Sequence, residues 1–338
     1  MNASNDLPDF ARCCVNLATP RLGAEAVSAS DEFFAPRARL IDDAAAVFIP
    51  DKYDDHGKWM DGWESRRKRS PGHDHCIVRL GVKGRIRGVD IDTSHFTGNY
   101  PPAASIEACL AGKRPLSQAT WREIVPATTL GPSAHHFVAV SDDGVFDHVR
   151  LNIYPDGGVA RLRVYGEAVA AWADDGDDGV YELSALANGG RIVGCNDAHY
   201  GSVWTLITPG RGRDMGDGWE TRRRREPGND WLVLALGAPG LIERIEIDTC
   251  HFKGNFPDRA AVAGALVAGG GDRSLITRAM LWPEVLAPRK LQADHIHTFA
   301  VRHPQPVSHV RLDIFPDGGV SRLRVFGRLC KAPETLSA

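Results

Sequence analysis

The sequence predicts an all-β protein made of two tandem β-sandwich modules of jelly-roll type. The first observation is a period of two: apolar and polar residues alternate along Val89–Thr93 and Ile245–Thr249, as in strands with one buried face. The second is the frequency of turn residues, because 35 glycines and 21 prolines interrupt the 338-residue chain and leave few long helical patterns. The third is an internal duplication, which divides the chain into two similar halves.

The duplication consists of three motifs that recur in the same order. The three pairs are Asp61–Arg69 with Asp217–Arg225, Asp92–Asn99 with Asp248–Asn255, and Tyr154–Val164 with Phe315–Val325. Asp217 follows Asp61 by 156 residues and Asp248 follows Asp92 by the same 156, whereas Phe315 follows Tyr154 by 161. A surface loop of different length is therefore expected between the second and third motifs of each module.

The repeats predict the domain boundaries. We expect a polar N-terminal leader at 1–16, a first module at 17–168, an acidic linker at 169–180, a second module at 181–328 and a C-terminal tail at 329–338. The linker is predicted from Ala173–Gly179, where aspartates and glycines mix as in segments that join domains. A module of roughly 150 residues is long enough to bury its own core.

The elements expected within a module are short strands joined by polar loops. In the first module we expect a loop at 61–69, a strand at 89–93 and a second loop that begins where this strand ends, at Asp92–Asn99. Alternation before and after Pro155–Gly158 predicts a β-hairpin with glycine at the turn. The second module repeats this order, and its Ala261–Gly270 segment fits a short helix or a strand equally well.

The composition argues against several classes of protein. A net charge of −3 with 25% charged residues gives no electrostatic reason to expect a nucleic-acid partner. Seven cysteines without a Cys-x-x-Cys spacing support neither a disulfide framework nor a zinc knuckle, so a reducing compartment fits best. The N-terminus lacks the pattern of a signal peptide, and no apolar run approaches the roughly 20 residues of a membrane helix. We expect a cytoplasmic protein without a membrane partner.

At these motifs the sequence resembles the allantoicase family. The Asp-Gly-Trp-Glu-x-Arg-Arg, Asp-Thr-x-His-Phe-x-Gly-Asn and Pro-Asp-Gly-Gly-x-x-Arg-Leu-Arg-Val segments occur twice in the expected order, over about Leu17–Gly327. The resemblance implies two tandem jelly-roll modules of galactose-binding-like fold. It also implies a hydrolase acting on carbon–nitrogen bonds of linear amidines, which converts allantoate to ureidoglycolate and urea in purine degradation.

The implied reaction requires three kinds of side chain. Allantoate carries one carboxylate and two ureido groups on a single carbon, so loss of urea needs protonation of the departing nitrogen and activation of water. Carboxylates and imidazoles can move these protons, and the catalytic candidates are Glu64, Asp92, His95, Glu220, Asp248 and His251. Guanidinium groups can hold the carboxylate and amides the ureido groups, and the substrate-binding candidates are Arg66, Arg67, Asn99, Arg222, Arg223 and Asn255.

Each kind of candidate also has a structural interpretation. His95 and His251 follow an aspartate by three residues, which suits either an acid–base pair oriented by that aspartate or a buried pair that holds a loop. The arginine runs suit local ion pairs as well as ligands, and nucleic-acid binding is the least favoured interpretation. The tryptophan of each Asp-Gly-Trp-Glu motif is expected to be a core or loop anchor.

Several alternatives stay open on the sequence. Cofactor-free hydrolysis and a divalent metal ion both fit, because Asp and His co-occur without a tight ligand spacing. Each module could bear a site, or the two could differ, because Ser94 is replaced by Cys250 and the second module lacks the charge pattern of Lys52–His56. A homo-oligomer is one alternative for assembly. The rival function is a non-catalytic tandem jelly-roll that binds a sugar or a small ureido ligand.

Overall fold

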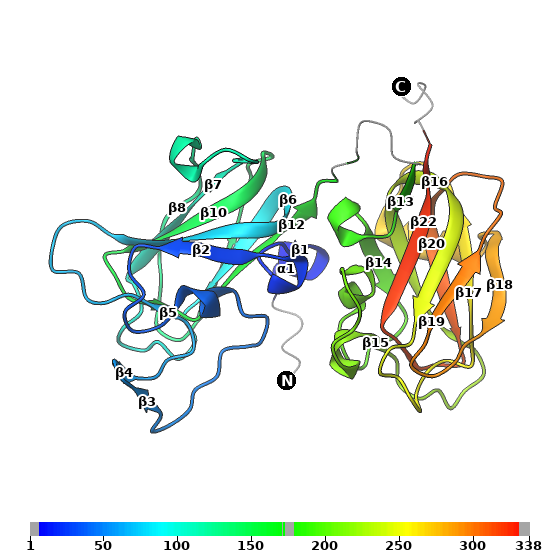
Figure 1. Ribbon diagram of the computed structural model, residues 1–338, viewed down its shortest axis with the longest axis horizontal. Helices are drawn as coiled ribbons and strands as arrows, with labels where there is room; N and C mark the ends of the chain where they lie inside the picture. The colour runs from blue at the N-terminus through cyan, green and yellow to red at the C-terminus, as the bar shows by residue number, and fades with distance from the viewer. Residues whose placement is uncertain (1–6, 171, 173–178, 331–338) are drawn as a thin grey trace. The chain divides into compact units, whose positions relative to one another are not determined.

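Two compact units, residues 1–169 and 170–338, make up the protein, which we call the first and second modules (Figure 1). The computed structural model describes residues 7–170, 172 and 179–330. Antiparallel strands dominate both modules, as the period of two predicts. None of the helices in these described ranges is long and apolar enough to cross a membrane.

The first module contains an eight-stranded sheet in the order β1-β12-β6-β10-β7-β8, with β2 and β9 also pairing with β6. Its strands are β1 (Val15–Asn16), β2 (Glu25–Ala29), β6 (Asp74–Asp92), β7 (Ala103–Cys109), β8 (Arg122–Thr129), β9 (His135–Ala139), β10 (Val145–Tyr154) and β12 (Arg161–Ala168). The long strand β6 pairs with β2 and β10 in its first half and with β9 and β12 in its second half. It therefore connects the two layers of the sandwich.

The second module repeats this topology in the order β13-β22-β16-β20-β17-β18, with β14 and β19 beside β16. Its strands are β13 (Val180–Glu182), β14 (Arg191–Cys195), β16 (Asp230–Asp248), β17 (Arg259–Ala265), β18 (Glu284–Lys290), β19 (Ile296–Ala300), β20 (Val307–Phe315) and β22 (Arg322–Leu329). The segment that fitted a helix or a strand thus begins within β17, because alternate residues of that strand enter the core.

Short elements complete each module. Two-residue strands form three small sheets: β3 (Tyr53–Asp54) with β4 (Gly57–Lys58), β5 (Trp63–Glu64) with β11 (Gly158–Val159), and β15 (Trp219–Glu220) with β21 (Gly319–Val320). The α-helices are α1 (Asp9–Cys13) and α2 (Asp272–Ala279). The 3-10 helices are η2 (Pro20–Leu22), η3 (Arg37–Ile41), η4 (Leu116–Gln118), η5 (Leu186–Asn188), η6 (Val203–Ile207) and η7 (Met215–Asp217).

The core of each module lies between the two layers. In β10 the apolar residues Val149, Leu151 and Ile153 are fully buried, and each contributes about 1.5–3 kcal/mol by leaving water. The predicted hairpin on either side of Pro155–Gly158 is wrong, because β10 and β12 do not pair with each other. Each pairs instead with β6, on its opposite edges, so the chain crosses between layers after the turn.

The expected leader, linker and tail are described only in part. Within the polar leader expected at 1–16, residues 9–16 form α1 and β1, which belong to the first module, and β1 pairs with β12. The apolar ring of Phe10 accounts for this, since it lies against Gly88 of β6, where any larger side chain would collide with it. Residues 1–6, most of the predicted linker and residues 331–338 lie outside the described ranges.

Candidate active site

A buried Asp–Arg pair joins the first and third motifs in each module. In the first module, Nη2 of Arg161 donates to Oδ2 of Asp61 at 2.8 Å, and Nε donates to the carbonyl of Ala44 at 2.9 Å. Arg161 is only 2% exposed, a burial that a guanidinium tolerates only when it is paired and hydrogen-bonded. Arg322 and Asp217 repeat the pair in the second module. Part of the duplicated polar pattern therefore holds the fold together.

The two tryptophans of the first motif are core anchors, as the sequence predicts. Trp63 and Trp219 are fully buried, and the indole N–H groups donate to the carbonyls of Asp31 and Asp197, both at 2.8 Å. Side chains alternate along a strand, so the residue after the tryptophan faces the other way. The inward indole thus fixes where Glu64 of β5 points.

Glu64 lies in a pocket of about 600 Å³ in the first module. The pocket is lined by Phe34, Phe48, His56, Gly57, Lys58, Met60, Glu64, His95, Thr97, Gly98, Asn99 and Ser133. It brings together three of the predicted site residues, Glu64, His95 and Asn99, which come from two separate motifs. A pocket of this size with a few convergent polar groups is typical of a small-molecule site.

Glu64 is the most strongly perturbed acid of the pocket. It is 8% exposed, and its Oε1 accepts a hydrogen bond of 2.7 Å from Nδ2 of Asn99. Burial raises the pKa of Glu64 and the negative charge of Asp54 raises it further, whereas the Asn99 hydrogen bond opposes them. The net pKa lies above the usual range of a glutamate, so this carboxyl keeps a proton more readily than an exposed one. Such a group is suited to donate a proton near neutral pH.

His95 takes a left-handed backbone conformation, with φ of 69°, and its ring faces the loop before β3. Nε2 lies 3.1 Å from the carbonyl oxygen of Ala46. Because a carbonyl only accepts, we infer that Nε2 carries the hydrogen and that Nδ1 of the neutral ring holds a lone pair. His95 can therefore accept a proton at Nδ1.

The two interpretations of Asp92 and His95, an acid–base pair oriented by the aspartate and a buried pair that holds a loop, both require contact between the side chains, and the structure gives each of them another partner. Oδ1 of Asp92 accepts a hydrogen bond of 2.7 Å from the backbone N–H of Ser94, and Oδ2 lies 4.0 Å from Nε2 of His135. The left-handed turn at His95 carries the imidazole away from the aspartate and towards the Ala46 carbonyl. Asp92 thus shapes the loop, and it does not line the pocket.

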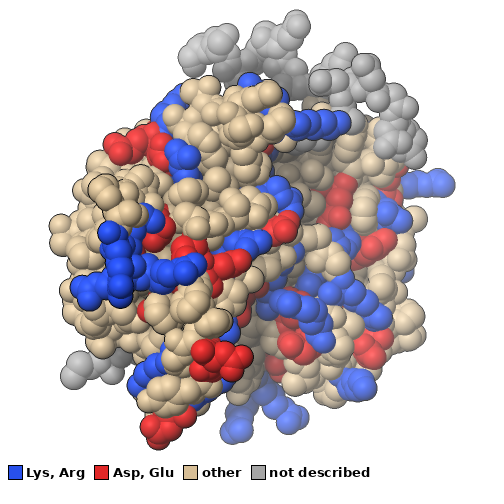
Figure 2. Space-filling model, turned by 60° about the vertical axis from the view of Figure 1, so that its left-hand side comes forward, with Lys and Arg blue, Asp and Glu red and all other residues tan. Residues whose placement is uncertain are grey.

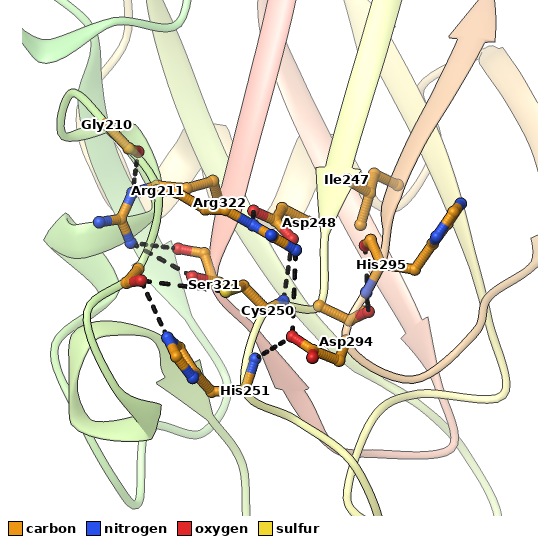
Figure 3. Close-up of polar contacts among 12 residues, drawn as sticks. Gly210, Arg211, Ile247, Asp248, Cys250, His251, Asp294, His295, Ser321 and Arg322 are labelled. Atoms are coloured by element: carbon orange, nitrogen blue, oxygen red, sulfur yellow. Dashed lines mark hydrogen bonds and ion pairs between the residues drawn. The ribbon is translucent and has the colours of Figure 1, made fainter.

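The second module repeats this arrangement with one added ion pair (Figure 3). Asp248 accepts from the backbone N–H of Cys250 at 2.9 Å, and Nε of Arg211 donates to its other oxygen at 3.2 Å. Nε2 of His251 faces the carbonyl of Gly212 at 2.9 Å. The aspartate again stabilises the loop, and a backbone carbonyl again orients the histidine.

The second module also keeps the acid–amide pair. Nδ2 of Asn255 donates to Oε1 of Glu220, as Asn99 does to Glu64. Glu220 is half-buried where Glu64 is buried. The two modules therefore hold the same pair in different surroundings.

The predicted arginine ligands lie outside the Glu64 pocket. Nε of Arg66 donates to Asp31 at 2.8 Å, and Arg222 is bound in the same way to Asp197. Arg67 is exposed and forms no hydrogen bond or ion pair with any residue that the structure describes. Arg223 belongs to a separate pocket of about 410 Å³ whose lining contains neither Glu220 nor Asn255.

Ion pairing explains why Arg66 and Arg222 lie outside the pocket. Asp31 and Asp197 each precede the motif in the chain and satisfy the first arginine locally, through its backbone N–H as well as its guanidinium. On the face shown in Figure 2, Lys and Arg side chains are likewise interspersed with Asp and Glu. No expanse of a single sign dominates that face.

Sequence reasoning missed the lining residues contributed by the small β3–β4 sheet. His56, Gly57 and Lys58 line the pocket, and Nζ of Lys58 lies 4.5 Å from the centre of the Phe48 ring. The available signal was the charge pattern of Lys52–His56, which the second module does not repeat. That difference marked the segment but did not show which site it reaches.

One group of described residues has the spacing of a metal site, and it lies away from the Glu64 pocket. Cys109, Asp147 and His148 place their ligand atoms within 4.8 Å of one another. Asp147 already accepts hydrogen bonds from the backbone N–H groups of Ala111 and Gly112 and pairs with His148. These contacts explain the cluster as a cap on the turn after β7.

Comparisons with known proteins agree on one family. The allantoicase repeat model matches residues 15–169 and 181–330. Probable allantoicase 1 of Burkholderia mallei is 58% identical over 327 residues, covering 96% of this chain and 97% of that protein. The probable allantoicase of Ralstonia nicotianae is 55% identical over 325 residues, with 95% and 97% covered. A crystal structure of allantoicase from Saccharomyces cerevisiae superimposes with a TM-score of 0.80 at 36% identity, covering 97% of this chain and 98% of that chain.

Proposed function

The chain belongs to the allantoicase family and is a hydrolase that converts allantoate to ureidoglycolate and urea, and we propose that this reaction takes place in the Glu64 pocket of the first module. The observation that carries this placement is a buried carboxyl with a raised pKa, held by Asn99 inside a pocket that also contains His95. This is the combination of acid, base and positioning group that the reaction requires.

Glu64 supplies the proton for the departing group. Asn99 donates to Oε1, which leaves Oε2 to carry the proton. Transfer of this proton to the nitrogen of one ureido group allows its bond to the central carbon to break, and urea leaves as a neutral molecule. The lone pair of the remaining ureido nitrogen stabilises the carbon while it is electron-deficient.

His95 supplies the base for the second half of the reaction. A water molecule loses a proton to Nδ1, and its hydroxyl adds to the central carbon to give ureidoglycolate. The ring stays in the required tautomer because the Ala46 carbonyl holds the hydrogen of Nε2. At the end Glu64 is ionised and His95 is protonated, and exchange with solvent returns both to their starting states.

The test is the release of urea from allantoate by matched variants. Glu64→Gln keeps the shape of the side chain and removes its acid, so we expect kcat to fall by about 100-fold or more. Glu220→Gln is the control, because it makes the same change in the same motif of the second module. Unchanged turnover in Glu64→Gln, or an equal loss in both variants, would contradict a site confined to the first module.

Other expectations belong to the proposal and have their own measurements. A metal requirement would show as loss of urea release after dialysis against a chelator and its recovery with a divalent ion. Self-association would show in light scattering of the purified chain. A cytoplasmic location and the absence of a nucleic-acid partner stay predictions from composition.

A further inference from the structure

The two modules differ by an insertion next to the pocket. Ala44 and Gly210 are equivalent, because their carbonyls accept from Arg161 and Arg322, and they lie 166 positions apart. Asp61 and Asp217, which pair with the same arginines, lie 156 positions apart. The first module therefore carries ten more residues between these points, and β3 and β4 lie within this longer segment.

The inserted segment is held in place, although much of it is exposed. The ring of Trp59 lies between two cations, with Nζ of Lys52 at 3.7 Å and the guanidinium carbon of Arg39 at 4.9 Å. Arg39 also donates to the carbonyl of Met60 at 2.9 Å, and Met60 is buried against Phe96 and Ala160. Cation–π contacts and an apolar anchor thus fix the base of the β3–β4 hairpin.

The hairpin brings the cation of Lys58 to the pocket, and no described acidic side chain pairs with it. Lys58 lines the pocket, and its ammonium forms no ion pair with any residue that the structure describes. By contrast, Arg66 and Lys68 of the first motif are bound to Asp31 and Asp74. Burial keeps Glu64 inclined to hold its proton, so that carboxyl does not serve as a permanent counter-charge.

The second module offers no equivalent cation. Its shorter segment, residues 208–216, contains Arg211 and Arg213, and both face aspartates: Asp248 at 3.2 Å and Asp217 at 3.6 Å. Figure 3 shows Arg211 directed at Asp248 beside His251. The second module thus keeps the Glu220–Asn255 pair but has no uncommitted cation in this segment.

We propose that Lys58 binds the carboxylate of the substrate and that the ten-residue insertion makes the first module the catalytic one. This inference rests on the proposed function of the Glu64 pocket. Allantoate is an anion whose carboxylate does not react, so a flexible ammonium at the rim can hold it while the ureido nitrogen reaches Glu64. Such binding acts in the ground state and the transition state alike, and it sets KM more than kcat.

The experiment compares Lys58→Met with wild type in urea release. We expect KM for allantoate to rise by about 10-fold to 100-fold with kcat changed much less, because a charged hydrogen bond is lost. Lys58→Arg keeps the charge and should restore most of the affinity. Lys113→Met is the control and should leave KM unchanged, since it removes an exposed lysine of the same module that does not line the pocket.

A binding measurement separates this inference from the proposed function. In a Glu64→Gln background turnover of allantoate is slowed by about 100-fold or more, so calorimetry that is fast compared with this turnover gives its Kd directly. Adding Lys58→Met should weaken that Kd by the same factor, and it should abolish the preference for allantoate over its carboxamide analogue. An unchanged Kd overturns the role of Lys58 and leaves the Glu64 site standing, whereas full activity of Glu64→Gln removes the Glu64 site itself.

Discussion

Among single residues, the comparison of Glu64 with Glu220 is the most informative. Both carboxylates accept a hydrogen bond from the asparagine that ends the second motif, seven residues after its first aspartate. Only Glu64 is also enclosed by an additional hairpin, whose Asp54 raises its pKa. Identical motif letters therefore lie in different surroundings, and in the first module desolvation and a nearby negative charge raise the pKa of Glu64.

Removal of the asparagine tests this balance. In Asn99→Ala the hydrogen bond that lowers the pKa of Glu64 is lost, so that pKa rises further. Because the protonated form is the active one, activity is present below the pKa and lost as pH rises through it. We expect the basic limb of the kcat profile against pH to move to higher pH, with kcat/KM reduced by about tenfold from the lost contact.

The matched control is Asn255→Ala, which removes the equivalent amide of the second module. Its pH profile should coincide with that of wild type. A basic limb of Asn99→Ala that moves to lower pH would show that Glu64 does not act as the acid.

At the scale of the elements, two kinds of arginine hold the loops: one is buried inside the module and the other is exposed at its surface. Arg161 of β12 is enclosed and holds the Asp61 loop, whereas Arg66 is 63% exposed at its side chain and pairs with Asp31. A buried guanidinium leaves an uncompensated partner when it is removed, but an exposed pair contributes at most ~1 kcal/mol. The third motif thus stabilises the Asp61 loop through Arg161, although it contributes no residue to the lining of the pocket.

The stabilities of two variants should show this difference. We expect Arg161→Met to lower the free energy of unfolding by about 3–5 kcal/mol, because the half-buried Asp61 loses its partner and the carbonyls of Ala44 and Ala160 lose their donor. Arg66→Ala should lower it by ~1 kcal/mol or less. Urea denaturation followed by tryptophan fluorescence measures both, and equal losses would contradict the assignment of Arg161 as the buried support.

In the molecule as a whole, duplication kept the sandwich and changed several connecting segments: α2 lies between β17 and β18 where the first module has η4, and the first module alone has the β3–β4 hairpin. Both modules have the same strand order, the same buried tryptophan and the same Asp–Arg pair. The differences that bear on chemistry are concentrated in the segment before the first motif, where the first module has the β3–β4 hairpin. A rigid scaffold that carries function on its loops can change activity without refolding.

The second module alone should therefore fold without catalysing the reaction. The second module is a compact unit of its own, and we expect a fragment of residues 179–338 to unfold cooperatively in a thermal melt monitored by circular dichroism. Urea release from allantoate should be absent. Turnover by this fragment at a rate near that of the whole chain would overturn the division between the modules.

Local pattern was enough to predict much of this protein. The duplication and the strands follow from letters that recur at fixed spacing, because alternation and turn chemistry act over a few residues. The same letters made Glu64, His95 and Asn99 candidates, and the structure brings these three side chains to one pocket. The allantoicase resemblance rests on the same letters, and the comparisons confirm it.

Only the tertiary structure decided which residues far apart in the sequence pair as strands, hydrogen-bond partners or ion pairs. β6 separates β10 from β12, Ala46 orients His95 in place of Asp92, and Asp31 holds Arg66 away from the pocket. Lys58 reaches the pocket because it lies on the inserted β3–β4 hairpin, a placement that no local period encodes. Ion pairs and loop positions depend on which groups meet once the core closes, so sequence spacing specifies the candidates while packing selects among them.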